Sequence, residues 1–417
     1  MSSAGPLPSA NPAARSAQGS PVSLAKPLRR RSLIDRARRQ AAVCVALVAA
    51  ALLPWAEARA QSAEPKTSIV AQGLVNPWGL AFLPDGRLLV TERPGRMRIV
   101  AADGKLGSPL PGLPPVLSEG QGGLLDVAID PRFASNRLVY WSYSEAAGSD
   151  ESGNGTSVAR ARLDGERGAE RLADVQIIFR QWPKVASRLH FGSRLAFGHD
   201  GRLFITLGDR FSRKDDAQVL DNHLGKIVRI EADGRLPSDN PLLGKPGLPT
   251  ALKPEIWSYG HRNVQGAAIH PQTGELWISD HGPQGGDELN RVQPGRNHGW
   301  PLITYGRNYG SGSKIGEGSE RADVVAPLLH WVPTSIAPAG MAFLTSERYA
   351  GWKGNLFIAT LRGQSLLRIE LDGNRVVRQE RLLQQLNERL RHVVQGPDGL
   401  LYLLTDNADG RILRLLP

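Results

Sequence analysis

The feature that most constrains the fold is a short pattern that recurs six times along the chain. Each copy has an apolar run, a turn containing Pro, Asp or Gly, and a second apolar run rich in β-forming residues. Asp-Gly between two such runs is a strong hairpin signal, because the turn requires a positive φ. The sequence therefore predicts six β-hairpins, at Gly79–Val90, Leu125–Trp141, Leu195–Ile205, Gly266–Ile278, Gly340–Ile358 and Val393–Leu404.

The spacing of the hairpins predicts how they assemble. Counted from residue 61, each hairpin has about sixty residues, which is enough for a four-stranded antiparallel sheet and its loops. Radial repetition of such sheets is the β-propeller, so we predict an all-β fold, a six-bladed β-propeller with four-stranded antiparallel blades. The 46 glycines among 417 residues agree with a chain of many tight turns. A β-sandwich or two smaller β domains are the alternatives.

Residues 1–60 have the features of an export signal. The basic run Arg29–Arg39 precedes thirteen uncharged, mostly apolar residues, Ala41–Leu53, and Ala58-Arg59-Ala60 has the small-x-small form of a cleavage site. Thirteen residues are short for a membrane span, which needs about 20. Arg30-Arg31 gives the segment a twin-arginine character. An uncleaved anchor or a disordered tail is the alternative.

Most of the net charge of +11 belongs to that segment. Residues 1–60 hold nine Lys/Arg and two Asp/Glu, whereas the remainder holds 42 and 38, so the charge does not indicate a nucleic-acid partner. We predict an export signal with a disordered basic N-terminus over 1–60 and a propeller without a membrane span over 61–417, periplasmic or secreted, as a monomer or homodimer. The single cysteine, Cys44, lies in the signal, which excludes an internal disulfide framework or a cysteine-based metal site.

Glycine-rich loops beside the hairpins carry polar side chains that plain connections do not need. Loops at one end of a propeller channel lie together, so these groups can converge although they are far apart in the sequence. His190 is a candidate general base, because its unperturbed pKa of about 6.5 suits proton abstraction near neutrality. Four arginines predict an anionic ligand or developing negative charge, because guanidinium groups match carboxylates. They are Arg262, Arg362, Arg389 and Arg391.

Other motifs restrict the cofactor. Asp287-Glu288 supplies oxygen ligands without the spacing of an EF-hand, so a calcium site here would combine a carboxylate with backbone carbonyls. No Gly-x-Gly-x-x-Gly motif opens a helix after a strand, and no Walker-type loop occurs. These absences from the sequence argue against nicotinamide, Rossmann-type flavin and nucleotide-hydrolase sites.

Six loop motifs follow one another between about Asn76 and Leu416, and together they resemble those of a known family. They are Gly120–Leu125, His190–Leu195, Gly260–Asn263, His281–Asn290, Asn297–Pro301 and Arg389–Val393. In this order they resemble the soluble pyrroloquinoline quinone (PQQ)-dependent sugar dehydrogenases, specifically the aldose sugar dehydrogenase branch. The family fold is a six-bladed propeller with the quinone in the central channel, which agrees with the repeat count.

The resemblance implies oxidation of an aldose sugar at C1 to the lactone, with hydride transfer to PQQ and an electron acceptor of unassigned identity. His190 corresponds to the base that removes the proton of the anomeric hydroxyl, and Asp209 to the acid that orients this base. Arg262 corresponds to the arginine beside the reacting quinone oxygens. The implied cofactor-holding residues are Gln121, Arg262, Ser335, Arg362, Arg389 and Arg391, with Ser335 in place of a threonine found in some members.

The resemblance also implies two Ca²⁺ ions. The backbone carbonyls of Gly282 and Pro283 correspond to ligands of the calcium that polarises the quinone. Glu288 and the carbonyl of His298 correspond to ligands of a second, structural calcium. Other members have tyrosine at the position of His298, but a carbonyl ligand tolerates that change.

Two other function classes stay open at this point. A calcium-dependent lactonase or esterase would need a metal held by several channel-facing side chains and would leave the arginines unexplained. A carbohydrate-binding or partner-binding propeller is disfavoured because the base, its acidic partner and the cofactor arginines are all present.

Overall fold

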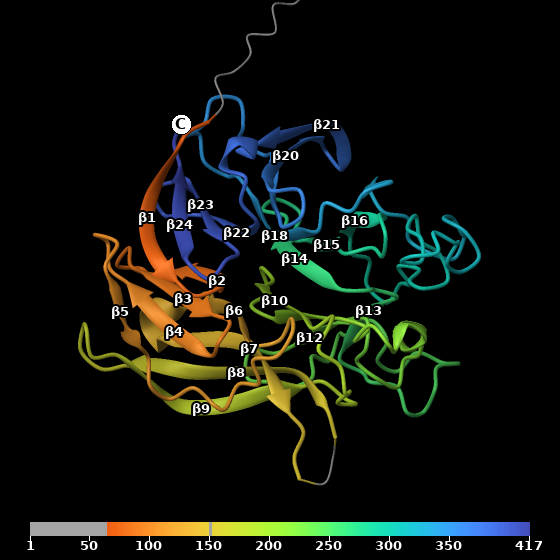
Figure 1. Ribbon diagram of the computed structural model, residues 1–417. Helices are drawn as coiled ribbons and strands as arrows, with labels where there is room; N and C mark the ends of the chain where they lie inside the picture. Colours follow the sequence, from red (N-terminus) through yellow and green to blue (C-terminus); the bar gives the residue numbers. More distant parts are fainter. Residues whose placement is uncertain (1–64, 150–151) are drawn as a thin grey trace, which may run out of the picture. The chain divides into compact units, whose positions relative to one another are not determined.

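Six four-stranded antiparallel sheets make up nearly all of the described chain and are arranged as a ring (Figure 1). The computed structural model describes residues 65–149 and 152–417, so the predicted export segment lies outside the described residues. The first strand of each hairpin lies nearest the centre of the ring, where β2, β6, β10, β14, β18 and β22 meet their neighbours (Figure 1). The predicted six-bladed β-propeller is confirmed.

Five sheets consist of four consecutive strands each. They are β2 (Pro77–Phe82), β3 (Leu88–Glu92), β4 (Arg96–Val100) and β5 (Leu106–Pro109); β6 (Leu124–Ile129), β7 (Leu138–Ala146), β8 (Asn154–Asp164) and β9 (Arg171–Arg180); β10 (Gly192–Phe197), β11 (Leu203–Leu207), β12 (Lys226–Ile230) and β13 (Ile256–Tyr259); β14 (Val264–Ile269), β15 (Leu276–Asp280), β16 (Asp287–Arg291) and β17 (Leu329–Trp331); and β18 (Pro338–Phe343), β19 (Leu356–Thr360), β20 (Ser365–Asp372) and β21 (Arg375–Leu382).

The sixth sheet closes the ring by joining the two ends of the propeller. Its strands are β22 (Leu390–Gln395), β23 (Leu401–Thr405), β24 (Gly410–Leu415) and β1 (Thr67–Leu74). Thr67 pairs with Leu415 in antiparallel register, so the first strand of the propeller is held by the last. This shared sheet closes the ring, and radial repetition of this kind leaves only short sheet edges.

The six predicted hairpins are the pairs β2–β3, β6–β7, β10–β11, β14–β15, β18–β19 and β22–β23. The second strand of each pair lies between neighbouring sheets. In β3, for example, every residue from Leu88 to Glu92 is buried, and β11, β15, β19 and β23 show the same pattern. Burial on both faces explains why these strands appear in the sequence as continuous apolar runs.

Within residues 65–149 and 152–417, helical structure is limited to short connections. It consists of α2 (Phe133–Asn136) and two 3₁₀ turns, η1 (Lys214–Gln218) and η2 (Gln384–Leu386). In the part of the chain that the structure describes, no helix is long and apolar enough to cross a membrane.

One buried guanidinium connects the inner strands of five sheets. Arg194 on β10 donates to Asp126 Oδ1 on β6 at 3.0 Å, to the carbonyl of Gln265 on β14 at 2.7 Å and to the carbonyl of Arg391 on β22 at 3.0 Å. Its guanidinium carbon lies 4.0 Å from the ring centroid of Trp78 on β2. Removing one partner of such a buried pair typically costs about 3–5 kcal/mol, so this contact fixes the centre of the propeller.

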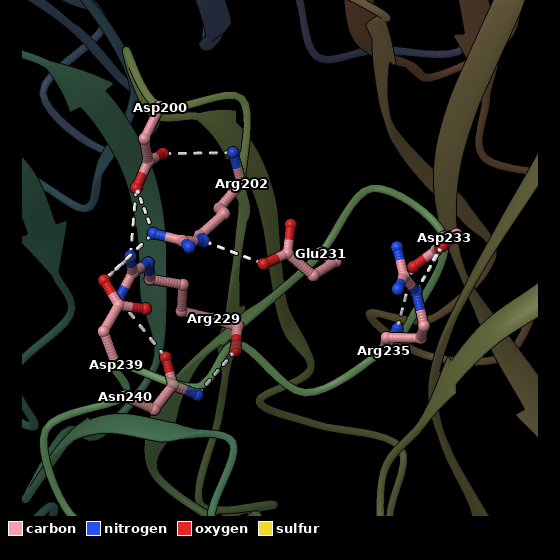
Figure 2. Close-up of polar contacts among 8 residues, drawn as sticks. All are labelled: Asp200, Arg202, Arg229, Glu231, Asp233, Arg235, Asp239 and Asn240. Carbon is pink, nitrogen blue, oxygen red and sulfur yellow. Dashed lines mark hydrogen bonds and ion pairs between the residues drawn. The ribbon is translucent and has the colours of Figure 1, made fainter.

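A second charged network lies at the other end of β10, around the turn of its hairpin (Figure 2). Arg229 donates to Asp200 at 3.0 Å and to Asp239 at 3.1 Å, and Arg202 donates to Glu231 at 2.9 Å. The network borders a surface cleft of about 500 Å³. The carboxylates that line this cleft all take part in hydrogen bonds or ion pairs. The charged network therefore holds the long connection between β12 and β13 in place.

Candidate active site

A cavity of about 440 Å³ is lined by residues from all six sheets and their connecting loops. This volume lies within the usual range of about 300–1,000 Å³ for small-molecule sites. Its polar lining includes Arg93, Gln121, Asn263, Gln265, Arg389, Arg391 and Asp406. The structure therefore brings together loops that are up to about 300 residues apart in the sequence, as expected for one end of a propeller channel.

His190 and Asp209 form a buried pair beside this cavity. Nδ1 of His190 lies 2.6 Å from Oδ1 of Asp209, and the two residues are 6% and 1% exposed. The two loops approach so closely that a Cβ on Gly208 would lie 2.1 Å from the carbonyl oxygen of His190. The glycine before Asp209 is therefore a steric requirement of the pair.

The backbone of His190 is held in a conformation that few residues adopt. Its φ is 53°, in the left-handed region, which costs roughly 1–3 kcal/mol and is found most often at functional sites. The backbone N–H of His190 donates to Oε1 of Gln121 at 2.8 Å. Gln121, which was predicted from the sequence to hold the cofactor, thus lines the cavity and also fixes the histidine.

The surroundings of His190 keep its imidazole neutral at neutral pH. Burial lowers the pKa of His190 below its ordinary value, Asp209 opposes this by raising it, and Arg262 lowers it again. With Nδ1–H donated to the carboxylate of Asp209, Nε2 has a free lone pair and no hydrogen-bond partner among the described residues. A neutral imidazole with one free nitrogen can accept a proton.

Arg262 is buried on the loop between β13 and β14. Its Nη1 donates to the carbonyls of His281 and Gly282 at 3.1 and 2.7 Å. The carboxylate of Asp280 accepts hydrogen bonds from the backbone N–H groups of Arg262 and Asn263, at 3.0 and 2.7 Å, and these bonds fix the loop. The backbone N–H of Asp209 donates to the carbonyl of Arg262 at 2.9 Å, so the arginine lies directly beside the histidine pair.

The two arginines of the last motif share one carboxylate. Arg389 and Arg391 each donate to Oδ2 of Asp406, at 3.0 Å for the Nη2 atoms. Burial raises the pKa of Asp406, but the two guanidinium groups outweigh burial and lower it overall. Nε of Arg391 is buried without a hydrogen-bond partner. Together with Arg93, the cluster keeps an excess of positive charge over the single carboxylate of Asp406, which fits an anionic, carboxylate-bearing ligand.

Three of the predicted cofactor-holding residues, Arg262, Ser335 and Arg362, are not among those that line the cavity. Ser335 donates to Oδ2 of Asp287 at 2.7 Å, although Ala337 two residues later lines the cavity. Arg362 is exposed, its side chain has no partner within residues 65–149 and 152–417, and its neighbour Leu361 lines the cavity. Ser335 therefore supports the loop, whereas Arg362 is an exposed residue next to the lining residue Leu361.

The predicted calcium ligands lie close to one another around a small cavity of about 10 Å³. Gly282, Glu288 and His298 line it, and Pro283 follows Gly282 directly. The side chain of Glu288 is half-buried, and Asn290, at 3.0 Å, is its only donor among the described residues; partial desolvation raises the pKa of Glu288 to about 8. A half-buried carboxylate without a basic partner, beside a cavity about one water in size, fits a cation.

Two observations limit how a cation could be held there. The carbonyl of Gly282 already accepts a hydrogen bond from Arg262, so a cation would share this oxygen with the guanidinium. Among the described residues, no group of three or more His, Cys, Asp or Glu side chains is arranged to hold a metal. A cation at this position would therefore depend mainly on backbone carbonyls.

Arg93 and Asp406 are site residues that the sequence analysis did not identify. Arg93 donates to the carbonyl of Gly120 at 2.8 Å, on the loop that carries Gln121. Both residues directly follow the second strand of a hairpin, at the position that His281 occupies in another blade. This equivalent position in successive blades is the signal that could have revealed them.

Comparison with known proteins identifies the family. The family model described as Glucose / Sorbosone dehydrogenase matches residues 74–414. An aldose sugar dehydrogenase of Escherichia coli is 40% identical over 384 residues, which cover 91% of this chain and 99% of the relative. A crystal structure of a glucose dehydrogenase is 46% identical with a TM-score of 0.80, covering 85% of this chain and all of that one. The PQQ-bound form of an aldose sugar dehydrogenase from Streptomyces coelicolor is 32% identical with a TM-score of 0.66, covering 85% and 99%. The chain therefore belongs to the glucose/sorbosone dehydrogenase family of oxidoreductases.

Proposed function

We propose that this protein is a PQQ- and calcium-dependent dehydrogenase that oxidises aldose sugars at C1 to the corresponding lactones. The observation that carries the proposal is the combination of an arginine-rich central cavity with the buried His190–Asp209 pair beside it. The PQQ-bound relative from Streptomyces coelicolor supports the same cofactor here. PQQ, when bound, supplies the two-electron acceptor that no side chain can provide.

The proposed base is Nε2 of His190. It takes the proton of the anomeric hydroxyl as the hydrogen on C1 leaves with its electron pair, which leaves a C1 carbonyl and thus the lactone. Asp209 keeps Nδ1 protonated and accepts its hydrogen bond at 2.6 Å, so Nε2 is the nitrogen left to react. The carboxylate also stabilises the imidazolium that forms, as in other acid–histidine pairs.

Arginines bind and neutralise the anionic cofactor in this proposal. Arg389 and Arg391 would hold carboxylates of PQQ, together with Gln121, which lines the same cavity. Arg362 is proposed to approach the cofactor from its exposed position next to Leu361. Arg262 lies between the histidine pair and the Gly282 carbonyl, where its charge would stabilise negative charge on the reacting oxygens.

Calcium is proposed to bind next to the same loop. The carbonyls of Gly282 and Pro283 would contact the ion that polarises the quinone, and Glu288 with the His298 carbonyl would hold a structural ion. Within the described ranges, the backbone carbonyls of Pro283 and His298 accept no hydrogen bond, so both oxygens are available as ligands.

Residues 1–60 are proposed to direct export of the protein, so that it works in the periplasm or outside the cell, as a monomer or homodimer. Cell fractionation and N-terminal sequencing of the exported protein test this. Sequencing is expected to give an N-terminus close to Gln61, and an intact Met1 in the exported fraction would contradict it.

The function is tested by reconstituting the purified protein with PQQ and Ca²⁺. It is then assayed with glucose, other aldoses and disaccharides against an artificial electron acceptor, and the product is identified as lactone or hydrolysed aldonic acid. Turnover that requires both PQQ and an aldose is expected. Absence of turnover on every sugar, with the cofactor shown to be bound, would refute the proposed reaction.

A further inference from the structure

We propose that Trp300 is a positioning residue of the active site, which holds Asp209 by its indole N–H and supports Arg262 by its ring. The inference rests on the proposed function, because it assigns Trp300 a role in the same reaction. The family resemblance implies a role for His298 in the motif Asn297–Pro301 but none for Trp300.

The indole completes the hydrogen bonding of the Asp209 carboxylate. Nε1 of Trp300 donates to Oδ2 of Asp209 at 2.8 Å. Oδ1 of the same carboxylate faces Nδ1 of His190 at 2.6 Å and accepts the backbone N–H of Phe211 at 2.7 Å. Trp300 is thus the donor to Oδ2 in the described chain, and it fixes the plane of the carboxylate that orients the base.

The ring of Trp300 also faces Arg262. The guanidinium carbon of Arg262 lies 5.3 Å from the indole centroid, within the range of a cation–π contact. Because the same guanidinium donates to the carbonyl of Gly282, the indole lies between the histidine pair and the loop that carries the predicted calcium ligands. One side chain therefore sets the relative positions of Asp209 and Arg262.

Trp300 is itself held by hydrogen bonds to Gly260 and Gln218, which belong to the connections of a neighbouring blade. The backbone N–H of Trp300 donates to the carbonyl of Gly260 at 3.0 Å, and the backbone carbonyl of Trp300 accepts from Nε2 of Gln218 at 2.6 Å. Asn297 exchanges a second hydrogen bond with the same glutamine at 2.7 Å. Trp300 comes from the long connection between β16 and β17, whereas Asp209 follows β11, so the contact joins two blades.

Loss of the indole N–H has a distinct electrostatic consequence. The charged groups that face His190 are Asp209, Arg262 and Asp280. Without a donor at Oδ2, the negative charge of Asp209 is less stabilised and attracts the imidazolium of His190 more strongly, so the pKa of His190 rises. A hydrogen bond to a charged group contributes about 1.5–3 kcal/mol, so turnover should fall by about tenfold or more.

The test compares Trp300→Phe with Trp141→Phe. Trp141 is equally large and buried, but its Nε1 has no hydrogen-bond partner, so the control loses volume without losing a donor. The imidazole signal of His190, assigned with His190→Gln, is titrated by NMR before and after loading with PQQ and Ca²⁺. Trp300→Phe is expected to raise the His190 pKa and lower kcat at least tenfold with little change in PQQ affinity. Trp141→Phe is expected to change neither.

The outcomes separate the two proposals. An unchanged His190 titration in Trp300→Phe would overturn the positioning role, whatever the activity. A raised His190 pKa in Trp300→Phe, combined with a wild-type protein that oxidises no aldose, would support the positioning role and refute the proposed function. If Trp300→Phe does not fold, 3-benzothienylalanine at position 300 keeps the bicyclic shape without the N–H. The His190 titration in that variant then tests the positioning role, with a raised pKa expected and an unchanged pKa overturning it.

Discussion

Nδ1 of His190 lies 2.6 Å from Oδ1 of Asp209, and both side chains are buried beside a cavity that all six blades line. The pair depends on two loops from the same sheet, one before β10 and one after β11. Burial would favour a neutral histidine of undefined tautomer, and the carboxylate selects the tautomer with a free Nε2. This arrangement supports the role of general base that we propose for His190.

His190→Gln should abolish turnover while PQQ still binds. A positioned general base contributes about 10²–10⁴-fold to the rate, and glutamine cannot accept the proton. Steady-state assay of the reconstituted variant, together with an absorbance titration with PQQ, measures both effects. Retention of most of the activity would show that another group is the base.

The pH dependence of kcat/KM should follow the protonation of His190. The histidine must be neutral to accept a proton, so the rate is constant above its pKa and falls as pH drops through it. Because burial lowers the pKa of His190, this fall should begin below the ordinary histidine value. Asp209→Asn removes an interaction that raises this pKa, so it should move the acid limb to lower pH and reduce the plateau. An acid limb that does not move in Asp209→Asn would show that Asp209 does not influence the pKa of the base.

Arg391→Gln should weaken PQQ binding more than Arg389→Gln. The Arg391 side chain is 9% exposed with an unpaired Nε, whereas that of Arg389 is 47% exposed and more strongly screened by water. We expect a loss of at least about tenfold in affinity for Arg391→Gln, since a buried charge pair loses one partner. Arg235→Gln, in the cleft at the other end of β10, serves as the control. Equal affinities of Arg391→Gln and wild type would argue against this cluster as the cofactor site.

Ca²⁺ should raise the Tm of the wild-type protein, and Glu288→Gln should remove much of this increase. A ligand that binds only the folded state stabilises it increasingly as the ligand concentration rises above Kd, and the variant loses the half-buried carboxylate of the small cavity. Thermal unfolding with increasing Ca²⁺, and with EDTA, measures the effect. Glu347→Gln is the matched control, because that side chain is 78% exposed. The same Ca²⁺-dependent increase in Glu288→Gln would place the ion elsewhere.

The fold could be predicted from the sequence because its repeating unit is local. Each hairpin has its two strands and its turn within about twenty residues, so six copies are visible without any tertiary information. Ring closure is not local. β1 has no hairpin partner of its own and pairs with β24, some 340 residues later in the chain, so its place could not be deduced from pattern alone.

The site was predictable only where its residues lie in motifs. His190, Gln121 and the arginines of the last motif belong to sequence motifs whose composition marks them. Arg93 and Asp406 are single charged residues that, in sequence, resemble solvated turn positions. The contact of Trp300 with Asp209 joins a long connection to another blade, and nothing in either segment indicates the other.

The most direct test of the account is a titration of the purified protein with PQQ in the presence of Ca²⁺, followed by absorbance. The account predicts stoichiometric uptake, one PQQ per chain, and bleaching of the oxidised cofactor when an aldose is added. A lactonase or a sugar-binding propeller requires no PQQ, so failure to bind it would contradict the central claim.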